Sequence, residues 1–169
     1  MDIPIRNANR DDLTEIMKIN HAVAYPEKKD GFLIQKRSIE EFQKLLKLSK
    51  YFLVAEAEGK IAGYLIALDE TADYLENELF SFYAKNYEKF TFVDQIAILP
   101  ECQGRGIGTK MYKKIRESES KRILIDIFLK PKNNQSIAFH EKLGFKFADE
   151  IINLKNGFES GVWELKSDY

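Results

Sequence analysis

The stretch Gln103-Gly104-Arg105-Gly106-Ile107-Gly108 lies between an apolar segment at 90–99 and a segment with helical periodicity at 109–117. This order predicts a strand, a glycine turn and a helix whose first turn carries few side chains. Backbone N–H groups at such a helix start are open to a ligand, and the helix dipole adds about half a positive charge there. The stretch therefore favours a phosphate or pyrophosphate ligand.

Two better-known phosphate loops do not match this stretch. A Walker loop requires lysine directly after its last glycine, whereas Lys110 follows Thr109. A dinucleotide fingerprint, Gly-x-Gly-x-x-Gly, would require glycine at position 109. The pattern that remains is Gln-x-x-Gly-x-Gly after a bend at Pro100. It resembles the signature of the GNAT superfamily, the acetyl-CoA-dependent N-acetyltransferases.

A second segment strengthens this resemblance. Residues 133–145 read Asn-Asn-Gln-Ser-Ile-Ala-Phe-His-Glu-Lys-Leu-Gly-Phe. They are similar to the other GNAT hallmark, an asparagine that opens a helix ending in Glu-Lys-Leu-Gly-Phe. One predicted helix and one predicted strand separate the two motifs, in the order that the family has. The resemblance extends from about Tyr51 to Phe147 and is strongest to small members without a well-established substrate.

The composition predicts one domain. A chain of 169 residues with 44% hydrophobic residues can bury a core, and no linker-like tract divides it, so we expect a single N-acetyltransferase domain over 1–169. A net charge of −1 argues against a nucleic-acid partner. No run approaches the ~20 apolar residues of a membrane span, and no signal peptide is recognisable. With the single cysteine, Cys102, these observations predict a cytoplasmic protein without a membrane partner.

Periodicity predicts an α/β domain around a mixed sheet. We expect strands at 3–6, 51–57, 61–68, 90–99, 122–129, 145–154 and 158–165. We expect helices that begin near Asp11 or Asp12 and at Ser38, and helices at 73–86, 106–117 and 134–143. The GNAT resemblance implies six to seven strands flanked by helices and splayed between the two central parallel strands.

Alternation along two strands predicts candidate bases. One face of the central strand would carry Phe90, Phe92, Asp94, Ile96 and Ile98, and the other Thr91, Val93, Gln95, Ala97 and Leu99. Asp94 is then a carboxylate on an apolar stripe, and Asp126 repeats this pattern between Leu124 and Phe128. Loss of hydration would raise the pKa of either group, which could then deprotonate a substrate ammonium. The alternative is a carboxylate that only accepts structural hydrogen bonds.

His140 is the candidate acid. Many GNAT members have tyrosine at this position, where the resemblance implies a proton donor to the leaving thiolate. An imidazolium could serve, with an unperturbed pKa of ~6.5 against ~8.5 for a thiol. Ser136 lies four residues earlier on the same helix face. The alternative is a histidine that only packs in the core.

The resemblance also implies the cofactor contacts. Backbone groups of Ile96, Ala97 and Ile98 would pair with the pantetheine arm of acetyl-CoA as an extra strand would. The pyrophosphate would lie against Gln103, Gly104, Arg105, Gly106, Ile107, Gly108 and Thr109. Asn133 would hydrogen-bond the arm from the opposite wall, with Ser136 and His140 on the same side. No metal is expected.

These expectations predict direct attack of a primary amine on acetyl-CoA in a ternary complex. The acceptor is a small-molecule or peptide amine, and the resemblance places its walls in 21–36 and 69–87. The alternatives are a non-catalytic acyl-CoA-sensing module and a nucleotide-phosphate binder that uses the same loop. The C-terminal strand pair around Trp163 either completes the sheet of its own chain or pairs across a dimer, and we favour a homodimer.

Overall fold

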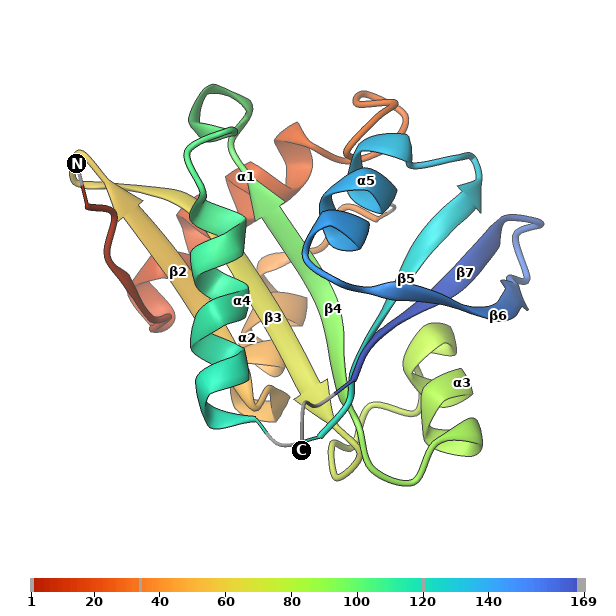
Figure 1. Cartoon of the computed structure of the whole chain (residues 1–169). Coiled ribbons are helices and arrows are strands. Elements are labelled where there is room, and N and C mark those ends of the chain that lie inside the picture. The colour runs from red at the N-terminus through yellow and green to blue at the C-terminus, as the bar shows by residue number, and fades with distance from the viewer. Residues whose placement is uncertain (1, 34, 120, 167–169) are drawn as a thin grey trace.

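A computed structural model describes residues 2–33, 35–119 and 121–166, and these form an α/β sheet structure (Figure 1). Residues 1, 34, 120 and 167–169 of the predicted domain lie outside the described residues. The strands are β1 (Ile5–Asn7), β2 (Tyr51–Ala57), β3 (Lys60–Asp69), β4 (Thr91–Ile98), β5 (Ile123–Lys130), β6 (Lys146–Asn153) and β7 (Glu159–Leu165). The helices are α1 (Leu13–Ala22), α2 (Ile39–Leu48), α3 (Glu78–Asn86), α4 (Ile107–Ser118) and α5 (Asn134–Lys142).

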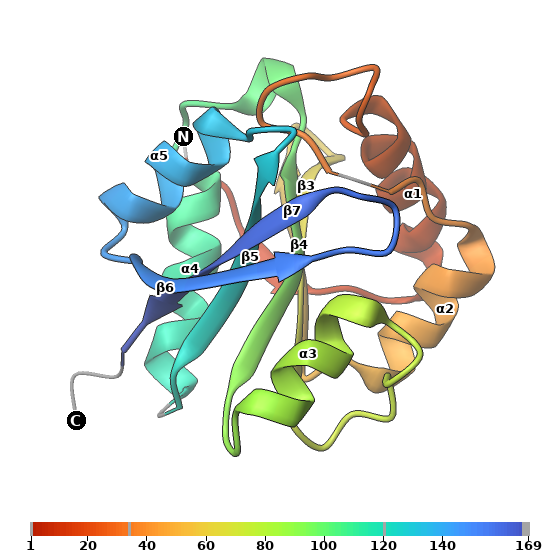
Figure 2. The same ribbon diagram turned by 90° about the vertical axis from the view of Figure 1, so that its right-hand side faces the viewer.

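The sheet has seven strands in the order β1-β2-β3-β4-β5-β7-β6, which confirms the mixed sheet. Helices α1, α2 and α3 cover one face, and α4 and α5 cover the other (Figure 2). Strand β7 pairs with both β5 and β6, so the C-terminal pair completes the sheet of its own chain. Among the described residues, no helix has both the length and the apolar character needed to cross a membrane.

Capping explains where two helices begin. The Ser38 hydroxyl accepts a hydrogen bond from the Glu41 N–H at 3.2 Å, as the sequence predicted for α2. The predicted helix at 73–86 is too long at its start, because Asn77 caps α3 by accepting from the Phe80 N–H at 2.9 Å.

Strands β4 and β5 separate after a short contact. Their parallel pairing includes Thr91 with Ile123, Phe92 with Leu124 and Val93 with Ile125, and it ends there. This confirms the splay that the resemblance implied. The gap between the two strands widens toward the carboxyl end of β4, next to α5 (Figure 1).

A bulge in β4 corrects the predicted faces of this strand. On β3, Ile66 lies opposite Gln95, but the next residue, Ala67, lies opposite Val93, so Asp94 is an extra residue. The alternation therefore shifts by one position. Phe92 and Ala97 both pack in the core beneath α1, α2 and α3, whereas Ile96 and Ile98 pack on the α4 side. The predicted assignment was wrong beyond Asp94, because alternation assumes an unbroken ladder.

Candidate active site

Two cavities meet where β4 and β5 separate. The larger, of about 540 Å³, lies between the end of β4, the glycine loop and α5. The smaller, of about 150 Å³, lies on the other side of the split and reaches α3 and the loop between β6 and β7. Both are lined by Phe32, Ile96 and Ser136. These three residues define the junction of the two cavities.

The glycine loop presents bare backbone to the larger cavity. Gly104 and Gly106 both have φ of +76°, and a Cβ added to either would meet no atom within 4 Å. Gly106 is the N-cap of α4, so the loop opens directly onto a helix N-terminus. Of the loop residues predicted to bind pyrophosphate, Gln103, Gly104, Gly106, Ile107, Gly108 and Thr109 line this cavity. Arg105 does not.

The separated edge of β4 offers unpaired backbone groups. The Leu99 N–H donates to the Ala62 carbonyl on β3 at 2.8 Å. Because backbone groups alternate in direction along a strand, those of Ala97 also face β3, while those of Ile96 and Ile98 face the gap. The Ile98 carbonyl accepts from Gln103 Nε2 at 3.3 Å. The predicted strand-like pairing is therefore possible at Ile96 and at the Ile98 N–H, whereas Ala97 only lines the wall.

Asn133 is already engaged with another segment. Its Oδ1 accepts from the Gly31 N–H at 2.8 Å, and its Nδ2 donates to the Phe32 carbonyl at 2.9 Å. The side chain therefore holds Phe32 at the junction. Each of these two atoms can form one more hydrogen bond, but Asn133 lines the smaller cavity and not the larger one, so its bond to the pantetheine arm stays a prediction.

Asp94 forms an ion pair with a partner that no sequence pattern indicated. Arg37, which lies two residues before the start of α2, donates from both Nη1 and Nη2 to the Asp94 carboxylate, the second at 3.2 Å. The two side chains are only 8% and 3% exposed. Asp94 thus accepts structural hydrogen bonds, the alternative that the sequence left open. No local sequence motif indicates that Arg37, unlike most arginines, is buried.

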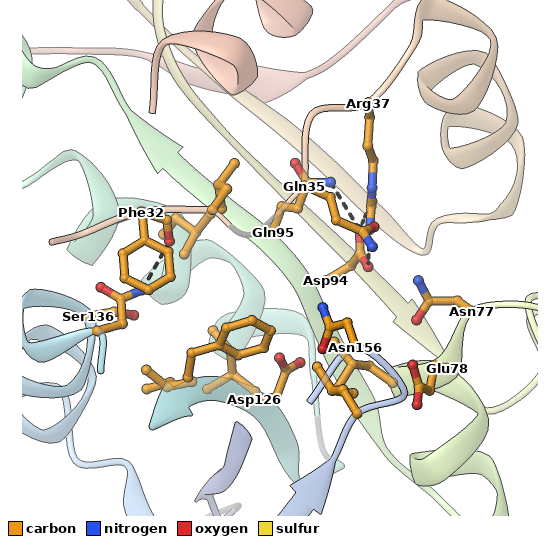
Figure 3. A pocket seen from close by; sticks show the side chains of 18 residues that line it. Phe32, Gln35, Arg37, Asn77, Glu78, Asp94, Gln95, Asp126, Ser136 and Asn156 are labelled. Atoms are coloured by element: carbon orange, nitrogen blue, oxygen red, sulfur yellow. Dashed lines mark hydrogen bonds and ion pairs between the residues drawn. The ribbon is translucent and has the colours of Figure 1, made fainter. Parts of the chain in front are cut away.

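Asp126 keeps the properties expected of a base. Its carboxylate accepts from the Ser160 hydroxyl at 3.3 Å and lines the smaller cavity (Figure 3). Burial, with a further contribution from the nearby negative charge of Asp94, raises the pKa of Asp126 to about 7. This side chain can therefore take up and release a proton at neutral pH.

His140 is buried in a neutral state. The ring is 1% exposed, and Nδ1 lies 2.7 Å from the Ser136 carbonyl oxygen. Because a carbonyl only accepts, Nδ1 carries the proton, and Nε2 accepts from the Tyr112 hydroxyl at 2.8 Å. Burial lowers the pKa of His140 to about 4. The imidazolium predicted from the sequence is not the state that this environment favours.

Both stretches predicted to hold the acceptor contribute to the smaller cavity. The first supplies Phe32, Leu33 and Gln35, with residue 34 outside the described residues, and the second supplies Asn77, Glu78 and Leu79. The loop between β6 and β7 adds Leu154 and Asn156, which no sequence pattern indicated (Figure 3). Glu78 joins α3 to this loop by accepting from the Lys155 N–H at 2.9 Å.

Comparison with known proteins gives a family match and many structural neighbours. The model of the Acetyltransferase (GNAT) family matches residues 11–145. An uncharacterized N-acetyltransferase of Methanocaldococcus jannaschii is 29% identical over 147 residues, which cover 84% of this chain and 60% of that protein. One from Archaeoglobus fulgidus is 28% identical over 115 residues, 67% of this chain and 71% of that one. The match thus spans 60% of the first relative's length, which is less than two thirds.

Solved structures share the fold at low sequence identity. The Salmonella typhimurium protein yncA, solved with its cofactor acetyl-CoA, has a TM-score of 0.70 and 20% identity, covering 100% of this chain and 96% of that one. Arabidopsis thaliana NAA60 in complex with acetyl-CoA has a TM-score of 0.72 and 15% identity, covering 98% of this chain and 99% of that one.

Proposed function

Because the chain belongs to the GNAT acetyltransferase family, we propose that it transfers an acetyl group from acetyl-CoA to a primary amine by direct attack in a ternary complex. The observation that carries this proposal is the junction of two cavities beside a carboxyl group with a pKa of about 7. A module that only senses acyl-CoA needs neither a second cavity nor a base. A nucleotide binder would not need the unpaired β4 edge.

The larger cavity has the features that acetyl-CoA requires. The open glycine backbone at the start of α4 suits the pyrophosphate, and the unpaired backbone groups of Ile96 and the Ile98 N–H suit the amide-bearing arm. When bound, acetyl-CoA supplies the acetyl group as a thioester. The chain orients that group at the junction, where Phe32 and Ile96 exclude water.

The smaller cavity favours an acceptor that arrives as a cation. Asp126 and Glu78 contribute carboxyl groups, while the positive charge of Arg37 is matched by Asp94. Because both guanidinium Nη atoms of Arg37 are committed to Asp94, that side chain has little left to offer an acidic acceptor. Asp126 takes a proton from the incoming ammonium, and the neutral amine can then attack the acetyl carbonyl.

Thiol release from acetyl-CoA, measured over polyamines, amino acids, aminoglycosides and peptides, tests this function. Turnover with one class identifies the acceptor. An Asp126→Asn variant should lose about 10²- to 10⁴-fold in rate, the usual contribution of a general base. An Asp73→Asn variant is the matched control, because Asp73 is exposed and lines neither cavity.

Three outcomes would redirect the proposal. Tight acetyl-CoA binding without thiol release on any amine would favour the sensing module. ATP binding stronger than acetyl-CoA binding would favour the nucleotide-phosphate binder. Equal rates for wild type and Asp126→Asn would exclude Asp126 as the base.

A cytoplasmic location and a homodimer remain predictions, which fractionation and light scattering would check.

A further inference from the structure

Ser136 has a distinctive place in the fold. It lies in the first turn of α5 and is one of three residues shared by both cavities. The other two, Phe32 and Ile96, have apolar side chains. Ser136 therefore supplies the one polar side chain that reaches the junction from the described residues, and it is half-buried. In the proposed ternary complex, the bond between carbon and sulfur would break at this junction.

A buried relay of hydrogen bonds holds Ser136 from behind. The Tyr112 hydroxyl donates to His140 Nε2, and the His140 Nδ1–H donates to the Ser136 carbonyl at 2.7 Å. The same ring nitrogen lies 3.3 Å from Ser136 Oγ. Because Nδ1 already carries a proton, it cannot accept one from the hydroxyl. In the described part of the chain, Oγ has no other hydrogen-bond partner, so the Ser136 O–H remains available to a ligand.

We infer that Ser136 is a catalytic residue, whose hydroxyl donates a hydrogen bond to the sulfur of CoA as the thiolate leaves, and that His140 and Tyr112 position it. This inference rests on the proposed acetyl transfer. His140 thus acts through Ser136 and is a positioning residue. Without the imidazole, the Ser136 carbonyl loses the Nδ1–H donor and Ser136 Oγ loses its neighbouring ring nitrogen.

The proton balance differs from that of an imidazolium acid. The amine loses one proton to Asp126, and the carbonyl carbon then forms a bond to nitrogen. When the C–S bond breaks, its electron pair leaves on sulfur. Asp126 passes the first proton to water, takes the second proton from the nitrogen, and releases that one to water as well, so that it is ionised again for the next cycle. The thiolate, held by Ser136, takes a proton from water on release.

A neutral hydroxyl suits this role. An alcohol is a much weaker acid than a thiol with a pKa of ~8.5, so Ser136 stabilises the thiolate without protonating it. The neutral state of His140 is consistent with this arrangement. Stabilisation by one positioned donor of this kind is expected to contribute roughly 10- to 100-fold to kcat.

The first test is the thiol pKa of CoA bound to the protein, followed by the ultraviolet absorbance of the thiolate during a pH titration. We expect this pKa to be lower by about 1 in wild type than in Ser136→Ala, as one hydrogen bond to a charged group predicts. Ser118→Ala is the matched control, because Ser118 is exposed at the end of α4 and, among the described residues, its hydroxyl bonds only to carbonyls of its own helix. It should behave as wild type.

The second test is turnover with the amine that the acceptor panel identifies. Ser136→Ala should lower kcat roughly 10- to 100-fold with an unchanged KM for acetyl-CoA. Ser136→Thr, which keeps the hydroxyl, should recover part of the rate. His140→Ala should raise the thiol pKa of bound CoA as Ser136→Ala does. The wild-type rate should show no fall between pH 6 and 8 that would signal an imidazolium acid.

The two proposals fail in different ways. If wild type does not bind CoA, both acetyl transfer and the role of Ser136 are refuted. If wild type binds CoA and acetylates an amine, but Ser136→Ala leaves the thiol pKa and kcat unchanged, only the role of Ser136 is refuted. A wild-type rate that falls with pH through an imidazole pKa would restore His140 as the acid.

Discussion

Replacing Asp126 with asparagine should reduce activity and at the same time make the folded protein more stable above neutral pH. The substitution keeps the size of the side chain and removes its ability to ionise. In the wild type, burial beside the negative charge of Asp94 makes ionisation of Asp126 unfavourable. At pH 8 the folded protein must carry that ionised group, whereas the variant does not.

The pH range follows from the direction of the pKa change. The pKa of Asp126 rises from 3.8 to about 7 on folding, so the folded protein holds a proton that the unfolded chain releases. The stabilising contribution of protonated Asp126 is therefore fully present below about pH 4 and is lost as the pH rises through about 7. A change of about 3 in pKa corresponds to roughly 4 kcal/mol. Partial exposure of the side chain lets solvent screen this cost, and we expect about 1–3 kcal/mol.

Urea denaturation of wild type and Asp126→Asn at several pH values between 4.5 and 8.5 would measure this effect. All other titrating groups are common to both proteins, so they largely cancel in the difference. That difference in free energy of unfolding should move in favour of the variant by about 1–3 kcal/mol as the pH rises. Asp73→Asn, at an exposed site, should show no such trend.

A difference between wild type and Asp126→Asn that is constant over this pH range would refute the reasoning. It would mean that Asp126 ionises in the folded protein as readily as in the unfolded chain. The wild-type rate of thiol release should also rise with pH through about 7, as a base with this pKa requires.

Other substitutions test the remaining contacts. Arg37→Met should cost about 3–5 kcal/mol in urea denaturation by leaving buried Asp94 unpaired, and adding Asp94→Asn should recover part of the loss. Gly106→Glu should abolish acetyl-CoA binding in calorimetry, because a negatively charged side chain would occupy the proposed pyrophosphate position. The circular dichroism spectrum should stay that of a folded protein, because a Cβ there meets no atom within 4 Å and the φ of +76° adds only a local backbone cost. Gly108→Ala places Cβ 2.7 Å from Phe139 Cζ and should cost about 1–3 kcal/mol in thermal unfolding, less with Phe139→Leu. Acetyl-CoA binding unchanged in Gly106→Glu would contradict the loop assignment.

Several features of the fold were predictable because they depend on short stretches of chain. A glycine turn with positive φ before a helix needs residues such as Gly104 and Gly106, wherever the rest of the chain lies. Serine at 38 with glutamate at 41 indicates a helix start by local hydrogen bonding alone. The two motifs and the strand between them therefore predicted the family, the mixed sheet and a glycine turn before a helix.

The bulge at Asp94 was not predictable from the alternation of residues in β4. It arises from the register between β3 and β4, which are distant in the sequence. One extra residue is enough to reverse the faces of Ile96 and Ile98. The alternation of residues in one strand cannot indicate a bulge, because a bulge depends on the pairing with the neighbouring strand.

The chemistry of the candidate site depends on such long-range contacts. Asp94 and Asp126 follow similar sequence patterns, yet Asp94 forms an ion pair with Arg37, while burial raises the pKa of Asp126. The sequence predicted His140 as a proton donor, but its hydrogen bonds to Tyr112 and to the Ser136 carbonyl place the single proton of a neutral ring on Nδ1. Local sequence can specify a turn or a helix start, because those depend on neighbouring residues. A pKa depends on every charge and dipole nearby, and folding brings these together from segments that are far apart in the chain.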